Sequence, residues 1–304
     1  MSSRSRVHLQ EVVTRDGFQS EVRFIPTADK IALIDRLSRT GLAKIEVTSY
    51  ASPKAIPMLA DAEAVMAGIT REPGVEYGVL VPNLKGAERA AAAKPDEFNL
   101  VMSVTEGHNL SNVRMTREQS FAALRDVVAL AKRERIPVNV SLSCCFGCPI
   151  DGEVTQAQAL GWAARYLELG VDGVSLCDTT GMAFPSQVAA MVREYRRRWP
   201  DAGLTMHFHN TRGLGLANVL ASANEGATRF DGSLGGLGGC PYAPGATGNV
   251  CTEDVAHLLE LEGFDTGVDL LALLAVARDI PTLVGHEVPG QVMKAGRRLD
   301  RPAR

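Results

Sequence analysis

Two histidines, His207 and His209, lie two residues apart in a run that reads as a β-strand. Side chains alternate along a strand, so both imidazoles project from one face of the same rigid element. Two neutral imidazoles placed in this way suit a single divalent metal ion. Because a lone pair of this kind more often serves packing or hydrogen bonding, the metal hypothesis depends on oxygen ligands that reach the same place.

Oxygen ligands are available in two other segments of the chain. Asp16 follows the first predicted strand, and Asn249 ends a glycine-rich segment. Together with His207 and His209 they offer two oxygen and two nitrogen ligands, which leaves open positions on an octahedral ion such as Mg²⁺ or Mn²⁺. A closed zinc site favours cysteine or histidine throughout. The alternatives are a turn role for Asp16 and a helix-capping role for Asn249.

Four more residues have groups suited to acid–base or electrostatic chemistry. Glu46 is a carboxylate inside an apolar predicted strand, so it needs a cationic partner, and Arg15 is the nearest candidate. Arg15 would stabilise an oxyanion, and Glu46 and Asp178 would orient Arg15 and a metal-bound water. Cys240 lies among glycines that would let its thiol swing over the site as acid, base or nucleophile. The alternative for Cys240 is a small inert hydrophobic residue.

Strand-like and helix-like runs alternate along the chain. The predicted strands are residues 7–13, 44–50, 75–81, 97–104, 137–144, 173–177, 204–209 and 229–235. The predicted helices are residues 27–39, where Thr27 is placed to cap, 57–68, 84–93, 116–133, 155–169, 185–199, 214–224, 251–261 and 268–278.

Strands separated by helices imply right-handed crossovers and a parallel sheet, and eight such units close a (β/α)₈ barrel. An open doubly wound sheet is the alternative, but its glycine-rich first turn is missing here. We therefore predict an α/β fold, a single TIM-barrel catalytic domain over residues 1–304. The barrel covers about 7–262, and an extra C-terminal helix and tail cover 263–304. The chemistry of such barrels lies at the carboxyl ends of the strands, where the candidate residues fall, as do Glu106, His108 and Asn109.

Composition excludes several classes of protein. The net charge of −3 and a pI near 6.1 give no electrostatic case for nucleic acid binding. No apolar run is long enough for a membrane span or a signal peptide, so we expect a cytoplasmic protein. The six cysteines are too few and too unevenly spread for a disulfide framework, so most should be free thiols, including the pair Cys145 and Cys148.

Six ordered segments resemble the 3-hydroxy-3-methylglutaryl-CoA lyase family over residues 7 to about 275. They are Thr14-Arg15-Asp16-Gly17-Phe18-Gln19, Ile45-Glu46-Val47-Thr48-Ser49, Ser143-Cys144-Cys145-Phe146-Gly147-Cys148-Pro149, Asp178-Thr179-Thr180-Gly181, His207-Phe208-His209-Asn210 and Gly238-Gly239-Cys240-Pro241-Tyr242-Ala243. The resemblance implies a metal-dependent (β/α)₈ lyase of leucine degradation that splits the acyl-CoA thioester into acetyl-CoA and acetoacetate. It also implies a homodimer or higher homo-oligomer.

The resemblance assigns roles to particular residues. It implies that Asp16, His207, His209 and Asn249 bind the metal, that Arg15 stabilises the enolate, and that Cys240 protonates it. The expected substrate contacts are Gln19, Ser141 and Thr179. The general base stays open among a metal-bound hydroxide, a site histidine and Asp178.

Two other enzyme classes share a similar barrel and His-x-His pair, namely Claisen-type synthases and biotin-dependent carboxyltransferase domains. The thiol of Cys240 favours a lyase over a synthase. A non-enzymatic alternative is a metal-bound acyl-CoA binding protein. The chain departs from the lyase pattern at Phe18, Ser20 and Val22, where Val22 replaces a lysine, and at Ser141, which replaces a tyrosine. These changes affect substrate contacts rather than the metal ligands or the acid.

Overall fold

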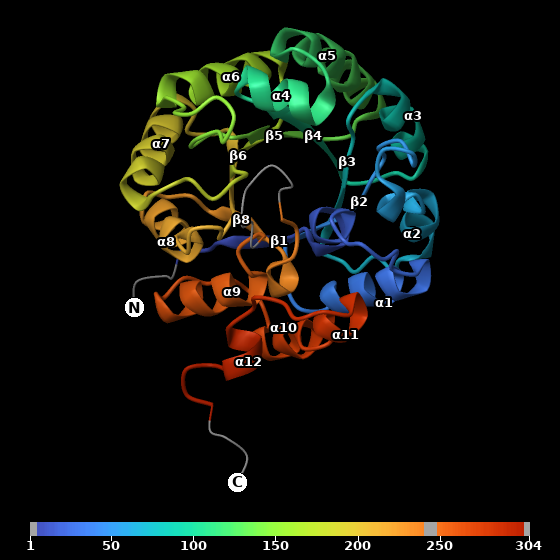
Figure 1. Cartoon of the computed structure of the whole chain (residues 1–304), viewed down its shortest axis with the longest axis vertical. Coiled ribbons are helices and arrows are strands. Elements are labelled where there is room, and N and C mark those ends of the chain that lie inside the picture. The colour runs from blue at the N-terminus through green and yellow to red at the C-terminus, as the bar shows by residue number, and fades with distance from the viewer. Residues whose placement is uncertain (1–4, 240–247, 301–304) are drawn as a thin grey trace.

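The computed structural model describes residues 5–239 and 248–300. Eight parallel strands pair in chain order, and the last returns to the first to close a barrel. Figure 1 looks down this barrel and shows the helices around its outside. The predicted (β/α)₈ architecture is therefore confirmed. The strands are β1 (His8–Glu11), β2 (Lys44–Ser49), β3 (Glu76–Leu80), β4 (Glu97–Ser103), β5 (Val138–Ser143), β6 (Gly173–Asp178), β7 (Gly203–Phe208) and β8 (Arg229–Gly232).

The helices follow the strands in the expected alternation. Hydrogen-bonded capping boxes at Thr116 and Thr155 fix the starts of two of them. The helices are α1 (Thr27–Leu37), α2 (Ala62–Gly68), α3 (Leu84–Ala92), α4 (Glu106–Val113), α5 (Arg117–Glu134), α6 (Gln156–Leu169), α7 (Pro185–Arg198), α8 (Gly215–Asn224), α9 (Thr252–Leu261), α10 (Leu270–Ala277), α11 (Ile280–Val284) and α12 (Val292–Ala295). Three short turns are η1 (Val13–Gly17), η2 (Pro57–Leu59) and η3 (Leu234–Gly236).

The two faces of each strand serve different purposes. In β5, Val138, Val140 and Leu142 belong to the hydrophobic core, while Asn139 and Ser141 alternate with them and form hydrogen bonds inside the barrel. Barrel interiors are usually filled by branched apolar side chains. Here the interior is largely polar, and a small cavity within it is lined by Gln10, Glu11, Val12, Lys44, Glu46, Asn99, Asn139, Ser175 and Asp231.

Helix α4 lies in a stretch for which no helix was predicted. Its start is capped from a distant segment, because the Asp151 carboxylate accepts a hydrogen bond from the Gly107 amide at 2.8 Å across 44 residues of sequence. A cap supplied by tertiary contact leaves no local sequence signal. The expected cap at Thr27 is wrong, since the helix begins at that residue and its hydroxyl donates to Asp61 Oδ2 at 2.7 Å.

The C-terminal region contains three short helices where a single helix was predicted. Helices α10, α11 and α12 lie outside the ring, near α1 and α9 (Figure 1). Asp254 holds the start of α12, because its Oδ1 accepts from the Val292 amide at 2.7 Å, and Met293 is buried. This segment is thus packed on the barrel through its last short helix.

Two sequence-based expectations are met within the described ranges. None of the helices there is long and apolar enough to cross a membrane. The five cysteines in those ranges, Cys144, Cys145, Cys148, Cys177 and Cys251, are buried free thiols.

Candidate active site and metal centre

A π-helical turn at the end of β1 places Arg15 and Asp16 at the mouth of the barrel. The predicted strand ends at Glu11, and η1 follows over Val13–Gly17. The buried carboxylate of Glu11 accepts from the Val13 amide at 2.8 Å and so fixes the start of this turn. Short π-helical segments are frequent at functional sites because they redirect side chains.

Three predicted metal ligands come together there. The ligand atoms of Asp16, His207 and His209 all lie within 4.8 Å of one another. The two imidazole Nε2 atoms are 3.1 Å apart, so the pair points at a common position. A carboxylate oxygen and two imidazole nitrogens that face one point make a donor set suited to a divalent cation.

Asn249 contacts this group through its amide nitrogen. Its Nδ2 donates to Asp16 Oδ2 at 2.7 Å and to the Leu237 carbonyl at 2.8 Å, while its Oδ1 is buried without a partner among the described residues. An orphaned buried oxygen costs free energy unless a ligand satisfies it. The alternative capping role is wrong, since α9 begins after Cys251 without a side-chain cap. These four residues therefore fit a metal ion.

Asp231 on β8 orients the first histidine. Its Oδ1 lies 2.6 Å from His207 Nδ1, which leaves Nε2 of His207 to face Asp16 and His209. Burial lowers the pKa of His207, but the Asp231 carboxylate outweighs it and the net shift is upward. Burial and the neighbouring His207 lower the pKa of His209 to about 3, so this imidazole is neutral near pH 7. A neutral imidazole is the form that binds metal.

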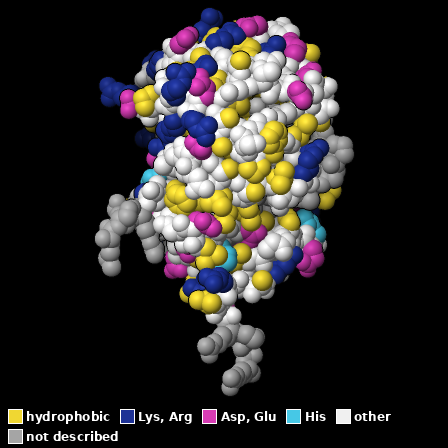
Figure 2. Space-filling model, turned by 90° about the vertical axis from the view of Figure 1, so that its left-hand side faces the viewer, with side chains coloured by type: hydrophobic (Ala, Val, Ile, Leu, Met, Phe, Trp, Pro, Cys, Tyr) yellow, Lys and Arg dark blue, Asp and Glu magenta, His cyan; other side chains and the backbone are white. Residues whose placement is uncertain are grey.

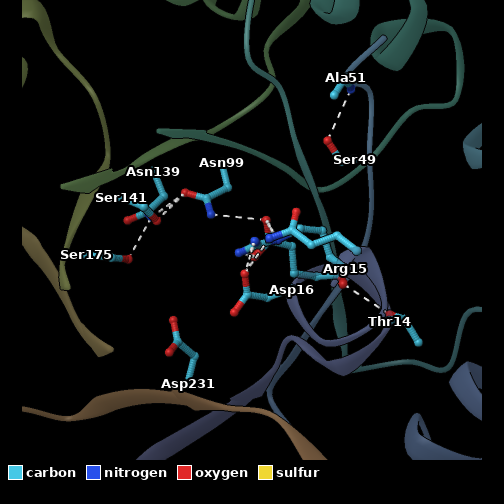
Figure 3. Close-up of polar contacts among 12 residues, drawn as sticks. Thr14, Arg15, Asp16, Ser49, Ala51, Asn99, Asn139, Ser141, Ser175 and Asp231 are labelled. Atoms are coloured by element: carbon cyan, nitrogen blue, oxygen red, sulfur yellow. Dashed lines mark hydrogen bonds and ion pairs between the residues drawn. The ribbon is translucent and has the colours of Figure 1, made fainter. Parts of the chain in front are cut away.

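Arg15 and Glu46 form the predicted ion pair. The guanidinium donates from Nη2 to Glu46 Oε2 at 3.0 Å, and Nη1 donates to Asp16 Oδ1 at 2.7 Å. Burial by itself favours a raised pKa for Asp16, but Arg15 and the two histidines outweigh it and the net shift is downward. Arg15 thus bridges the buried carboxylate of β2 and the metal-facing carboxylate (Figure 3).

Asp178 ends β6 and stays close to the backbone. Its Oδ1 accepts from the amides of Met182 and Ala183 at 2.7 and 3.1 Å, and its Oδ2 is buried without a partner among the described residues. Burial raises the pKa of Asp178 to about 6. The side chain is therefore able to exchange a proton near neutral pH.

The three predicted substrate contacts already have protein partners. Gln19 Nε2 donates to Asp16 Oδ1 at 2.9 Å, and Ser141 Oγ donates to Asn99 Oδ1 at 2.9 Å. Thr179 Oγ1 accepts from the Cys144 amide at 3.0 Å. Their contacts with substrate stay predictions.

Cys240 lies outside the described residues, but the chain on both sides of it borders the metal group. Gly238 has φ of +97°, and a Cβ there would lie 2.6 Å from Asn249 Nδ2 and 2.9 Å from Asp16 Oδ2. Only glycine permits such a close approach. On the return side, Asn210 N donates to the Gly248 carbonyl at 2.9 Å, which fastens the chain to the end of β7.

Other polar residues near strand ends serve locally. Asn109 braces its own loop through the Ser103 amide and the Ser120 hydroxyl, and Glu106 pairs with Arg117. His108 Nδ1 lies 2.6 Å from Ser103 Oγ. These residues do not belong to the metal group.

Sequence reasoning missed Asp231. Like Glu46, it is a carboxylate inside a predicted strand, and the same argument about buried charge would have found it. The register between β7 and β8 sets His207 opposite Asp231. The sequence alone does not identify this pairing.

The chain is similar to known proteins over nearly its whole length. A family model described as HMGL-like matches residues 6–280. The hydroxymethylglutaryl-CoA lyase YngG of Bacillus subtilis is 42% identical over 286 residues, which cover 94% of this chain and 96% of that protein. The (R)-citramalyl-CoA lyase of Chloroflexus aurantiacus is 36% identical over 300 residues, which cover 95% of each chain.

A solved structure is similar over the whole barrel. It is an HMG-CoA lyase from Acinetobacter baumannii in complex with coenzyme A and 3-methylmalate, with 48% sequence identity and a TM-score of 0.93 over 97% of each chain. The fold, the position of the Asp and His residues and these similarities lead to one conclusion. The chain belongs to the hydroxymethylglutaryl-CoA lyase family.

Proposed function

We propose that the protein is a metal-dependent carbon–carbon lyase that cleaves a 3-hydroxy-3-methylglutaryl-CoA-type thioester to acetyl-CoA and a 3-keto acid. The observation that carries this proposal is the convergence of Asp16, His207 and His209 at the mouth of the barrel, with Arg15 bound to Asp16. The family relationship supports a lyase over a condensing synthase or a binding protein.

Asp16, His207, His209 and Asn249 would hold the metal, which we propose to be Mg²⁺ or Mn²⁺. When bound, such an ion supplies Lewis-acid polarisation to the substrate oxygens. The protein's part is to present two imidazole nitrogens and two oxygens, with Asp231 fixing the orientation of His207.

The reaction is a retro-Claisen cleavage. Loss of the proton from the tertiary hydroxyl turns this oxygen into a carbonyl, and the bond between the second and third carbons breaks. The electron pair of that bond leaves on the thioester as an enolate. Arg15 would stabilise this negative charge, held in place by Glu46, and the Cys240 thiol would deliver a proton to the carbon.

The segments flanking Cys240 support its role as acid. Ser20 Oγ donates to the Gly239 carbonyl at 3.3 Å, and Gly238 approaches the Asp16–Asn249 pair closely. The described residues that directly precede Cys240 therefore lie beside the metal group.

A second substrate has specific support. One relative is named for (R)-citramalyl-CoA, and the solved structure of the Acinetobacter lyase contains the hydroxy diacid 3-methylmalate. Ser141 stands where lyases of the family commonly carry a tyrosine. We propose as an alternative substrate a thioester with a different substituent at the third carbon, such as the citramalyl thioester, whose carboxylate is bound there directly in place of a carboxymethyl group.

The assay for products separates the possibilities. Purified protein with Mg²⁺ is incubated with the 3-hydroxy-3-methylglutaryl and citramalyl thioesters, and release of acetyl-CoA and of the matching keto acid is measured. Equimolar release of both products supports the lyase. Tight binding of the thioester without any product contradicts it.

We also propose that the enzyme acts in the cytoplasm as a homodimer or higher homo-oligomer. Size-exclusion chromatography with light scattering at several protein concentrations tests the oligomeric state, and a monomer at all of them contradicts it.

A further inference from the structure

A chain of side-chain hydrogen bonds crosses the barrel interior beneath Arg15. Asn139 Nδ2 donates to Ser175 Oγ at 2.9 Å and to Asn99 Oδ1 at 3.0 Å. Ser141 Oγ also donates to Asn99 Oδ1, at 2.9 Å, and Asn99 Nδ2 donates to Glu46 Oε1 at 3.2 Å. Figure 3 shows this chain running from β6 through β5 and β4 toward Arg15.

The direction of every bond in this chain follows from one charged end. The ionised carboxylate of Glu46 can only accept, so Asn99 must turn its amide nitrogen toward Glu46 and its oxygen toward Asn139 and Ser141. Asn139 must then donate, and so must the Ser141 hydroxyl. The sequence of donors therefore has a single arrangement that satisfies all members.

We propose that Asn99 is a positioning residue for catalysis, which acts on Arg15 through Glu46. This inference rests on the proposed function, in which Arg15 stabilises the enolate. Nothing in the sequence reasoning singled out Asn99, because it is neither at a strand end nor ionisable.

Asn99 affects the position of Arg15 because both residues contact the Glu46 carboxylate. Arg15 faces both oxygens of the Glu46 carboxylate, since its Nη2 donates to Oε2 at 3.0 Å and its Nε lies 3.0 Å from Oε1. The Nε contact is an ion pair without a hydrogen bond, so the hydrogen bond to Oε1 comes from Asn99 Nδ2. Arg15, Glu46 and Asn99 are all buried, at 8%, 4% and 6% exposure, so water does not readily replace a lost bond. Without Asn99, Oε1 keeps only the Nε ion pair and loses its hydrogen bond, so we expect the carboxylate and the guanidinium paired with it to shift from the position that catalysis requires.

Ser141 also has a structural role in this network of hydrogen bonds. Its proton is used inside the barrel, on Asn99, so this serine fixes Asn99 from the side opposite Glu46. A tyrosine at this position would not place its hydroxyl there. The chain thus keeps Asn99 in place with Asn139 and Ser141 together.

The first test compares two near-isosteric variants of buried interior residues. Asn99→Leu removes every bond of Asn99, and Thr205→Val alters a 5% exposed residue on β7 that lies beside Ser175 in register but outside this chain of bonds. We expect Asn99→Leu to lower kcat by about 10- to 100-fold, with little change in KM. Thr205→Val should keep kcat within about three-fold of wild type. Circular dichroism checks that both variants are folded.

The second test uses Asn99→Asp, which keeps an acceptor for Asn139 and Ser141 but loses the donor to Glu46. Two facing carboxylates favour a shared proton, and the protonated form of the new carboxyl donates to Glu46 as the amide did. We therefore expect the ratio of its kcat to that of wild type to rise by at least about three-fold as the pH falls from about 8 to about 6. The other charged groups that face this region are present in both proteins, so the effect of their titration cancels in the ratio of the two kcat values. Besides Glu46 itself, these groups are Glu11, Arg15, Lys44, Glu97 and Asp231.

The outcomes separate the two proposals. Release of acetyl-CoA by wild type and Thr205→Val, with a slow Asn99→Leu and a pH-dependent ratio for Asn99→Asp, supports the positioning role. Equal kcat for Asn99→Leu and Thr205→Val, or a pH-independent ratio for a folded Asn99→Asp, overturns it while the lyase stands. A wild-type protein that releases no acetyl-CoA overturns the proposed function, and with it any catalytic role for Asn99.

Discussion

Asp16 is held from several directions by protein groups. Arg15 Nη1 and Gln19 Nε2 donate to its Oδ1 at 2.7 and 2.9 Å, and Asn249 Nδ2 donates to its Oδ2 at 2.7 Å. The carboxylate therefore has a fixed orientation beside the two histidines. Preorganised ligands of this kind reduce the ordering that a cation must impose when it binds.

Asp231→Asn tests whether the partner of His207 matters for the metal. The amide is similar in shape but lacks the negative charge of the carboxylate. His207 should therefore be less firmly oriented and less basic. We expect Mn²⁺ affinity to fall by about 10- to 100-fold in calorimetric titration. The matched control is Asp172→Asn, which changes a carboxylate that accepts from the Val138 amide at the other end of the barrel. Equal affinities for Asp231→Asn and wild type would show that Asp231 does not support the metal site.

Cys240→Ser tests the proposed acid. A group that protonates the enolate acts in the transition state, so kcat should fall by at least about 100-fold while KM stays near the wild-type value. Wild-type activity should also depend on a reducing agent, since oxidation of the thiol blocks proton delivery. Steady-state kinetics with and without dithiothreitol measure both effects. Unchanged turnover in the serine variant assigns the acid role to another group.

At the scale of elements, the site depends on two segments that are not regular. The π-helical turn η1 carries Arg15 and Asp16, and η3 (Leu234–Gly236) comes shortly before Gly238, which lies against Asp16 and Asn249. Glu11 connects them, because its Oε1 accepts from the amides of Val13 and Leu234 at 2.8 and 3.0 Å. Glu253 at the start of α9 adds a bond from Gly235 at 3.2 Å.

Glu253→Gln tests the pH dependence that this buried carboxyl creates. Burial raises the pKa of Glu253 to about 8, above the ordinary value of 4.5. Between about pH 4.5 and about pH 8, the folded state therefore keeps a proton on Glu253 that the unfolded state releases. The stability that this proton contributes is complete below about pH 4.5 and is lost as the pH rises through about 8. We expect Glu253→Gln to unfold like wild type at pH 5 and to be more stable by about 1–3 kcal/mol at pH 8. Urea unfolding at both pH values measures this difference, and equal stability of the two proteins at pH 8 contradicts it.

The regular elements were predictable and the irregular ones were not. Hydrophobic periodicity indicated all eight strands, because each is a short buried run between helices of clear period. The turn η1 and the helix α4 were not predicted, because each is stabilised by a carboxylate outside the element, Glu11 for η1 and Asp151 for α4. For the same reason, residue type suggested Asp16, His207, His209 and Asn249, but the polar network around Asn99 required the strand register.

At the scale of the whole molecule, the open question of substrate depends on the wall near Ser141. We expect higher kcat/KM for a thioester with a larger or differently polar substituent at the third carbon than for the methylglutaryl compound. Val22, where the family carries a lysine, is 95% exposed, and Phe18 is 1% exposed and packed in the core. Val22 therefore adds no wall to the pocket, and the alternative that Phe18 or Phe146 fills the space of the tyrosine is decided by the competition assay.

Ser141→Tyr is the matching variant for this prediction. It should shift preference toward the methylglutaryl thioester, at some cost in kcat because Asn99 loses a hydrogen-bond donor. Competition assays between the methylglutaryl thioester and the thioester with the other substituent measure the ratio of their kcat/KM values. If the methylglutaryl compound is already the better substrate of wild type and Ser141→Tyr leaves the ratio unchanged, the enlarged-pocket hypothesis is wrong.

The central claim is that the Asp16–His207–His209 group holds the metal that cleavage requires. The most direct measurement strips the protein with a chelator, removes the chelator, and follows acetyl-CoA release during addition of Mg²⁺ or Mn²⁺ to wild type and to His207→Ala. We predict no release from the stripped protein, full recovery of wild type with the metal, and activity of a folded His207→Ala lower by at least about 1000-fold. Full activity of the stripped protein, or of His207→Ala, would contradict the claim.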